Sequence, residues 1–115
     1  MQENRKNERF STSAQVIISD ITGTENRLKD INIIGCCVEC SKNIDIKPGS
    51  QHFIDIMPEK ASKIDMFQLS VECKWVRQIN NLTLIGFFIL ASPKGGQFQN
   101  YVDYLAYNRN KGVNG

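Results

Sequence analysis

The chain has 115 residues, of which 41% are hydrophobic and 23% are charged, as is typical of one globular domain. Its 14 basic and 12 acidic residues give a formal net charge of +2, which is too small to indicate a general nucleic-acid-binding or membrane-surface protein. The longest apolar stretch, at 82–91, is about half the length that crosses a bilayer, and the polar start MQENRKNERF is not a signal peptide. We therefore expect a cytoplasmic protein without membrane insertion.

The first expected elements are an arm and a short strand. Residues 1–12 are polar and charged without periodicity, so we expect a flexible arm there. Residues 14–19, AQVIIS, are rich in β-branched side chains and predict a strand. The segment ITGTEN at 21–26 is expected to form a turn at Gly23.

The segment DINIIG places two polar side chains among isoleucines, and its strand pattern stops at Gly35. Because side chains alternate in an extended chain, Asp30 and Asn32 are expected to share one face, and Ile31 and Ile33 the other. This would mount an acceptor and a donor side by side on a rigid element. In the alternative interpretation, Asp30 and Asn32 lie on the solvent-exposed face of an edge strand, and Gly35 is part of an ordinary β-bulge.

The four cysteines raise the question of a metal site, but their spacing argues against one. If GCCVEC is extended, Cys36 and Cys40 face one side and Cys37 the other, so the three cannot converge on one ion. Without a secretion signal, these thiols and Cys73 are expected to be reduced and structural. No Asn or Asp is recognisably placed to orient the single histidine, His52, and no nucleophile, base and orienting group can be assembled. We therefore expect no metal and no enzyme.

Strand patterns continue through the second half of the chain. A turn signal at 47–49 precedes an expected strand at 51–57. The clearest alternation runs over 67–77, and a turn at 80–81 leads into 82–90, which is hydrophobic on both faces. The residues of 67–77 expected to share one apolar face are Phe67, Leu69, Val71, Cys73 and Trp75.

Six short strands joined by turns predict a mainly β fold, a small closed antiparallel β-barrel, because closure removes exposed strand edges. A C-terminal helix follows, for which Ser92-Pro93 supplies an N-cap and first residue. Two glycines weaken its first turn, so we expect it to begin near Gln97. The barrel and helix are assigned to 13–107, and 108–115 is expected to be a disordered tail. Apolar residues at helical spacing are expected to face the barrel, and they are Phe98, Tyr101, Val102 and Leu105.

The order of these features resembles the PilZ domain family. The features are an N-terminal RxxxR motif, a strand ending in DINIIG, a KPGS turn, a long strand with Trp75, and a strand containing Gly-Phe before the terminal helix. The resemblance extends from about Arg5 to Tyr107. It implies a six-stranded barrel with a C-terminal helix, and many members of that family are receptors for the bacterial second messenger cyclic di-GMP.

The resemblance also implies a ligand site. The two binding signatures of the family are RxxxR and a D/N-x-S-x-x-G motif. They fall here on Arg5 and Arg9, and on Asp30, Asn32 and Gly35. Asn32 stands where the family pattern has serine. Asparagine offers a donor and an acceptor but is bulkier, so its effect on binding stays open.

The chemistry of these side chains suits cyclic di-GMP, which presents two phosphates and two guanines. Arginine donates paired hydrogen bonds to phosphate or to guanine O6 and N7, and it stacks on flat rings. Asp30 can accept hydrogen bonds from guanine N1–H and its amino group, and Gly35 allows unusual dihedrals and close approach of a ligand. Arginines on a mobile arm suit a sensor, because binding can order the arm and signal to a downstream protein partner.

Other classes of function stay open. A PilZ-like domain can lack ligand binding and act as a protein-interaction adaptor, and RKNER near a terminus is often only a solvated charged segment. A small barrel with exposed aromatic residues can bind single-stranded nucleic acid, but the near-neutral charge makes this the weaker interpretation. No cofactor is expected apart from the cyclic di-GMP ligand.

Overall fold

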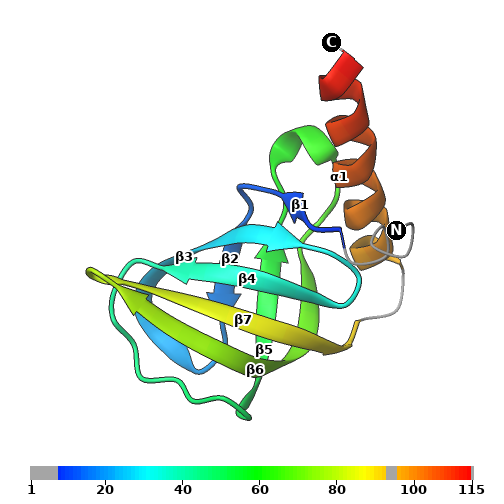
Figure 1. Cartoon of the computed structure of the whole chain (residues 1–115). Coiled ribbons are helices and arrows are strands. Elements are labelled where there is room, and N and C mark those ends of the chain that lie inside the picture. Colours follow the sequence, from blue (N-terminus) through cyan, green and yellow to red (C-terminus); the bar gives the residue numbers. More distant parts are fainter. Residues whose placement is uncertain (1–7, 93–95, 115) are drawn as a thin grey trace.

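The computed structural model describes residues 8–92 and 96–114, with side chains as far as Asn108. These residues form a mainly β fold with a helix at its C-terminal end (Figure 1). The strands are β1 (Phe10–Ser11), β2 (Gln15–Ile18), β3 (Ile21–Ile31), β4 (Gly35–Cys40), β5 (Gln51–Met57), β6 (Phe67–Ile79) and β7 (Leu82–Ala91). A short 3-10 helix, η2 (Lys60–Ser62), precedes β6, and the helix α1 (Gln97–Asn114) follows β7.

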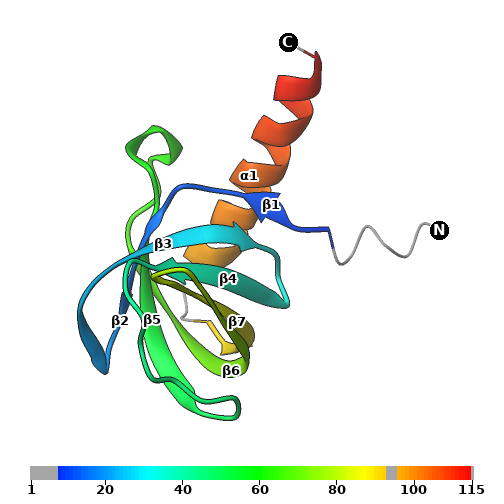
Figure 2. The same ribbon diagram turned by 60° about the vertical axis from the view of Figure 1, so that its left-hand side comes forward.

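Strands β2 to β7 form a closed antiparallel barrel (Figures 1 and 2). The strand order around it is β3-β2-β5-β6-β7-β4, and pairing of β3 with β4 closes the ring. The predicted six-stranded antiparallel barrel with a C-terminal helix is therefore confirmed. The short β1 adds to the end of β3, where Phe10 pairs with Ile31 and Ser11 with Asp30.

The barrel interior is filled by alternate side chains of its strands, as the two-residue period of a strand requires. Strand β2, for example, buries Val16 and Ile18 and exposes Ile17. Helix α1 contributes its predicted apolar face to the same core, where the rings of Phe98 and Tyr101 contact Phe67. Its later turns project away from the barrel (Figures 1 and 2). Each large apolar side chain buried in this way stabilises the fold by about 1.5–3 kcal/mol.

Tyr101 connects α1 to two other segments. Its side chain is fully buried, and its hydroxyl donates to Glu59 Oε1 at 2.7 Å. The same hydroxyl is hydrogen-bonded to Thr12 Oγ1, which in turn accepts the backbone N–H of Ala14 at 3.1 Å. Because a buried hydroxyl is costly without partners, these bonds favour one position of α1 against the segment after β1.

The prediction of a flexible arm over residues 1–12 is wrong at the C-terminal end of that segment, because Phe10–Ser11 form strand β1. Phe10 is partly buried against the core, and this contact anchors the strand. The rest of the predicted arm, residues 1–7 with Arg5, lies outside the described residues.

The turn expected at Gly23 is also wrong. The chain turns earlier, at residues 19–20, and β3 runs through Gly23. Gly23 has φ of 81°, and the register between β2 and β3 is irregular between the Val16 and Ile18 pairings. Glycine adopts this backbone conformation without steric cost, so here it permits an irregular strand.

Trp75 faces outward, contrary to the expectation that it shares the apolar face of β6. Phe67, Leu69, Val71 and Cys73 are buried as predicted, but Trp75 is 42% exposed. The register against β7 shifts between Cys73 and Trp75. A β-bulge adds one residue to a strand and therefore reverses which side chains face inward beyond it.

Helix α1 begins at Gln97, as expected, and extends to Asn114. It therefore includes most of the segment expected to be a disordered tail. Each residue added to an existing helix gains one backbone hydrogen bond, so extension does not require an apolar face. The expected first helical residue, Pro93, lies outside the described residues.

Candidate functional site

The turn between β3 and β4 contains Asn32, one of the predicted site residues. Its side-chain Oδ1 accepts hydrogen bonds from the backbone N–H groups of Ile34 at 2.8 Å and Gly35 at 2.9 Å. Asn32 is buried and Ile33 is exposed. The expectation that Asp30 and Asn32 share a strand face is therefore wrong, because β3 ends before Asn32 and these hydrogen bonds turn the chain.

Arg9 and Asp30 form an ion pair although they are 21 residues apart. The pairing of β1 with β3 brings them together, and Arg9 Nη1 donates to Asp30 Oδ1 at 3.0 Å. The two side chains are 46% and 31% exposed. An exposed ion pair contributes only about 0–1 kcal/mol to stability, so both groups can exchange this contact for one with a ligand at little cost.

Gly35 lies beside the guanidinium of Arg9. A Cβ on Gly35 would be 3.6 Å from Arg9 Nη2 and 2.5 Å from the carbonyl oxygen of Phe87. Gly35 does not have a positive φ, so the expectation of unusual dihedrals is wrong, and glycine is required by the close approach of β7. Three predicted site residues, Arg9, Asp30 and Gly35, are thus neighbours, while Arg5 lies outside the described residues.

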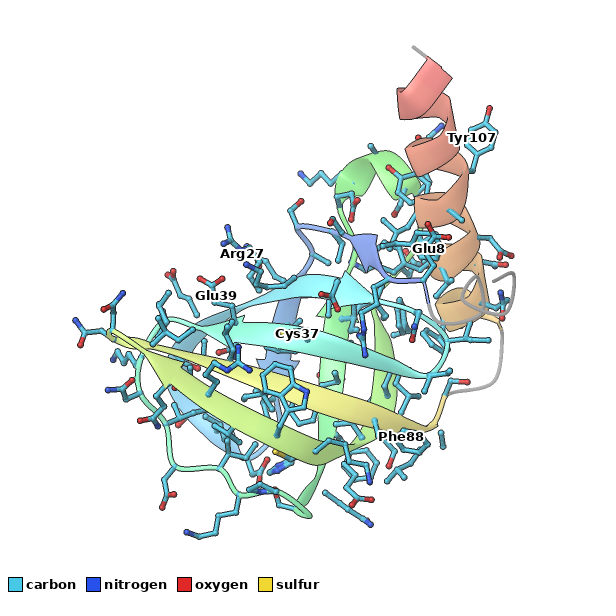
Figure 3. All side chains as sticks on the ribbon, viewed as in Figure 1. Glu8, Arg27, Cys37, Glu39, Phe88 and Tyr107 are labelled. Atoms are coloured by element: carbon cyan, nitrogen blue, oxygen red, sulfur yellow. The ribbon has the colours of Figure 1, made fainter. Side chains whose placement is uncertain are left out.

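A row of directly paired residues crosses the outer face of the barrel from Asp30. Asp30 pairs with Cys37 on β4, Cys37 with Gly86 on β7, and Gly86 with Trp75 on β6. Figure 3 shows Cys37 on β4, between β3 and β7. Neighbouring strands lie about 4.8 Å apart, so the row follows the curved barrel wall for about 14 Å. We call the surface formed by Arg9 and this row the Arg9–Trp75 face.

The indole of Trp75 lies over the backbone of Gly86. A Cβ on Gly86 would be 2.1 Å from the indole Nε1, so only glycine leaves room for the ring. The guanidinium carbon of Arg77 is 5.6 Å from the same ring. The surface position of Trp75 differs from the buried position predicted for it. The available signal was Gly86, because a glycine inside an apolar strand often marks the close approach of another group.

A second exposed ring lies near the C-terminal end of β7. Figure 3 labels this residue, Phe88, which is paired with Gly35 across β4 and β7. The ammonium nitrogen of Lys74 is 5.3 Å from the centre of the Phe88 ring. Trp75 and Phe88 therefore each have a cation beside the ring, within the distance at which a cation is attracted to an aromatic face.

Cys37 supplies a small, uncharged part of the Arg9–Trp75 face. The alternation predicted for GCCVEC is confirmed, since Cys36 and Cys40 are buried and Cys37 is half-buried. Burial raises the pKa of the Cys37 thiol, and the carboxylate of Asp30 raises it further. Cys37 is therefore a neutral thiol at physiological pH.

The Arg9–Trp75 face thus combines three kinds of surface. A guanidinium and a carboxylate lie at one end, the small and neutral side chain of Cys37 lies in the middle, and an exposed indole that covers Gly86 lies at the other end. The charged end can bind phosphate or the edge of a base. The indole can stack on a planar ring.

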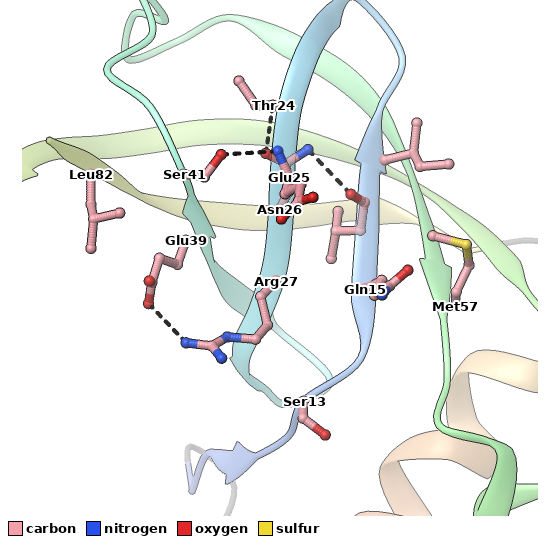
Figure 4. Close-up of a pocket in the computed structure, with 12 residues that line it drawn as sticks. Ser13, Gln15, Thr24, Glu25, Asn26, Arg27, Glu39, Ser41, Met57 and Leu82 are labelled. Carbon is pink, nitrogen blue, oxygen red and sulfur yellow. Dashed lines mark hydrogen bonds and ion pairs between the residues drawn. The ribbon is translucent and has the colours of Figure 1, made fainter.

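A separate cleft of about 720 Å³ lies beside β2 and β3 (Figure 4). Its lining includes Gln15, Glu25, Arg27 and Glu39 and none of the predicted site residues. Arg27 Nη2 is 3.5 Å from Glu39 Oε1, so this cation already has an acidic neighbour. Arg9 likewise has an acidic neighbour, so the cleft is the weaker candidate only because none of the predicted site residues line it.

No protein-family model matches this chain, and neither a curated protein nor a solved structure matches it. Within residues 8–92 and 96–114, no helix has the length and apolar character of a membrane span. The Arg9–Trp75 face and the sequence motifs are therefore the basis for a functional proposal.

Proposed function

We propose that the chain is a non-enzymatic bacterial receptor for cyclic di-GMP, which it binds on the Arg9–Trp75 face. The observation that carries the proposal is the contact of Arg9 with Asp30 beside Gly35. This contact joins two parts of the sequence that resemble the PilZ signatures. The guanidinium is suited to a phosphate or to guanine O6 and N7, and the carboxylate to guanine N1–H and its amino group.

The spacing of the face favours a dinucleotide. Its two ends are three strand spacings apart, about 14 Å along the curved barrel wall. Cyclic di-GMP carries two guanines and two phosphates on one ring and can engage both ends together, with one base stacked on Trp75. GMP can engage only one end at a time.

The signal would pass through the N-terminal arm. In this proposal the ligand binds Arg5 and Arg9 together and holds the arm in one position, which a downstream protein partner in the cytoplasm then recognises. No metal or cofactor is needed, because the arginines, Asp30 and the indole provide the contacts.

Calorimetric titration of the full chain with cyclic di-GMP tests this function. Saturable binding that GMP and GTP at the same concentrations do not displace is the expected result. Equal competition by these mononucleotides would contradict contact at both ends of the face. Titration also measures affinity and ligand number, which depend on the role of Asn32.

A protein-interaction adaptor without ligand binding is the second candidate. Four exposed apolar side chains, Ile33, Ile34, Phe88 and Leu90, support it. The backbone places Ile34 next to β7, because the N–H of Ile89 donates to the Ile34 carbonyl at 2.8 Å. Gathered apolar residues on a surface are typical of protein-binding sites. A folded protein that gives no heat with cyclic di-GMP would favour this adaptor.

A further inference from the structure

His52 lies in a hydrogen-bonded chain of three side chains. Its Nδ1 is 2.8 Å and 3.0 Å from the two carboxylate oxygens of Asp20, which lies in the turn between β2 and β3. Its Nε2 is 2.8 Å from Ser50 Oγ, in the segment before β5. The expectation that no Asp is placed to orient His52 is therefore wrong, because the fold brings Asp20 to the ring from 32 residues away.

The direction of these hydrogen bonds follows from the available protons. A neutral ring facing the Asp20 carboxylate carries its proton on Nδ1, which leaves Nε2 as an acceptor. The Ser50 hydroxyl can then donate to Nε2. It can also donate to the Lys47 carbonyl at 2.7 Å. When the hydroxyl turns to His52, that carbonyl still accepts the backbone N–H of Ser50 at 3.1 Å, so it keeps a partner.

We propose that Ser50 is a nucleophilic serine that captures activated acyl and phosphonyl groups, with His52 as its base and Asp20 as the residue that positions His52. A hydroxyl within hydrogen-bond reach of a base, with that base oriented by a third group, is the geometry that activates serine. This inference does not depend on cyclic di-GMP binding.

The reaction with a fluorophosphonate illustrates the step. Ser50 Oγ forms a bond to phosphorus, the P–F bond breaks, and fluoride leaves. The hydroxyl proton passes to His52 Nε2, and the imidazolium then releases it to water. With an aryl ester, Oγ bonds to the carbonyl carbon, the aryloxide leaves, and the proton on His52 passes to it.

The environment of His52 suits the role of a base held in one position. Its side chain is only 6% exposed, and the ring of Phe87 lies edge-on at 6.1 Å. The Asp20 side chain is 60% exposed. Water therefore screens its charge, and Asp20 acts mainly by fixing the tautomer and orientation of the ring.

Neighbouring backbone groups restrict the reagents that Ser50 can capture. The N–H of Gly49 donates to the Cys73 carbonyl at 2.7 Å, and the N–H of Ser50 donates to the Lys47 carbonyl. Neither is free to stabilise an oxyanion, and the loss of one such donor lowers rates by about 10²–10³-fold. We therefore expect single capture of reagents with good leaving groups, without amide hydrolysis.

The test is fluorophosphonate labelling of the full chain, followed by intact mass and peptide mapping. Ser62 is the matched control, because its hydroxyl also donates to a carbonyl three residues earlier, Glu59 O at 2.8 Å, while the single histidine of the chain contacts Ser50. General-base assistance contributes about 10²–10⁴-fold. We expect Ser50 to be labelled at least tenfold faster than Ser62, and His52→Gln to lower Ser50 to the Ser62 rate. Equal rates at the two serines, no labelling at Ser50, or an unchanged rate in His52→Gln would overturn the proposal.

Asp20→Asn tests the positioning role with a spectroscopic measurement. Nitrogen-15 spectra of the neutral ring should show the proton on Nδ1 in the parent and a shift toward Nε2 in Asp20→Asn, because Asn can donate to Nδ1 and so stabilise the other tautomer. Labelling at Ser50 should slow at least tenfold, while labelling at Ser62 should not change. An unchanged tautomer together with an unchanged labelling rate would remove Asp20 from the proposal.

Discussion

Replacement of Arg9 by alanine distinguishes a ligand contact from a structural ion pair. Arg9 donates to Asp30 at 3.0 Å, and both side chains are partly exposed. Loss of such a pair lowers the free energy of unfolding by at most about 1 kcal/mol, so the melting temperature should fall by no more than about 4–8 °C. In a complex, the guanidinium would form charge-assisted hydrogen bonds that contribute about 1.5–3 kcal/mol. Arg9→Ala should therefore raise Kd for cyclic di-GMP roughly ten- to hundredfold.

Arg9→Lys separates the shape of the guanidinium from its charge. Lysine keeps the positive charge but loses the planar fork and the stacking surface. It should therefore bind cyclic di-GMP more weakly than the parent and more tightly than Arg9→Ala. Affinity equal to that of the parent would show that only attraction between charges matters.

Arg27→Ala is the matched control for both variants. Arg27 is 59% exposed and lies 3.5 Å from the Glu39 carboxylate, but it is outside the Arg9–Trp75 face. Calorimetric titration and thermal melting of the three variants should show weaker binding only for the Arg9 changes. Parent-like binding by Arg9→Ala, or an equal loss in Arg27→Ala, would refute a specific contact between Arg9 and the ligand.

Three further changes test other parts of the structure. Trp75 is the single tryptophan, so stacking of a base on it should change the intrinsic fluorescence of the protein until binding is saturated. Trp75→Ala should weaken cyclic di-GMP binding by about 1–3 kcal/mol. Unchanged affinity for cyclic di-GMP would exclude the indole from the site. Gly35→Ala places a Cβ 2.5 Å from the Phe87 carbonyl oxygen and should lower the free energy of unfolding in urea by about 1–3 kcal/mol, whereas a parent-like midpoint would contradict the close approach of β7. The hydrogen bond from His52 lowers the pKa of Asp20 from its usual 3.8. The contribution of Asp20 to the free energy of unfolding is therefore present above pH 3.8 and is lost as the pH falls through the lowered pKa. The difference in unfolding free energy between the parent and Asp20→Asn should therefore shrink in acid, and an equal difference at neutral and strongly acidic pH would refute this linkage.

The sequence by itself determined the class of fold and the position of most strands. Strand β5 was predicted at 51–57, and β7 differs from its predicted range of 82–90 by one residue. These predictions depend on alternation and turn residues, which act between neighbours in the chain. Closure into a barrel also followed, because several short strands must pair their edges. The helix start at Gln97 was likewise predictable, since the glycines that weaken an earlier start are adjacent in sequence.

Only the tertiary structure decided which side chains meet at the two sites. Arg9 reaches Asp30 through the addition of β1 to β3. Asp20 reaches His52 because the antiparallel pairing of β2 with β5 places the turn after β2 beside the start of β5. Trp75 became a surface residue because a bulge reversed the alternation of β6. A bulge depends on the strand that pairs with it, and contacts between distant residues depend on how the barrel closes. Neither is encoded in local periodicity, so the residue types of the sites could be read from the sequence but their geometry could not.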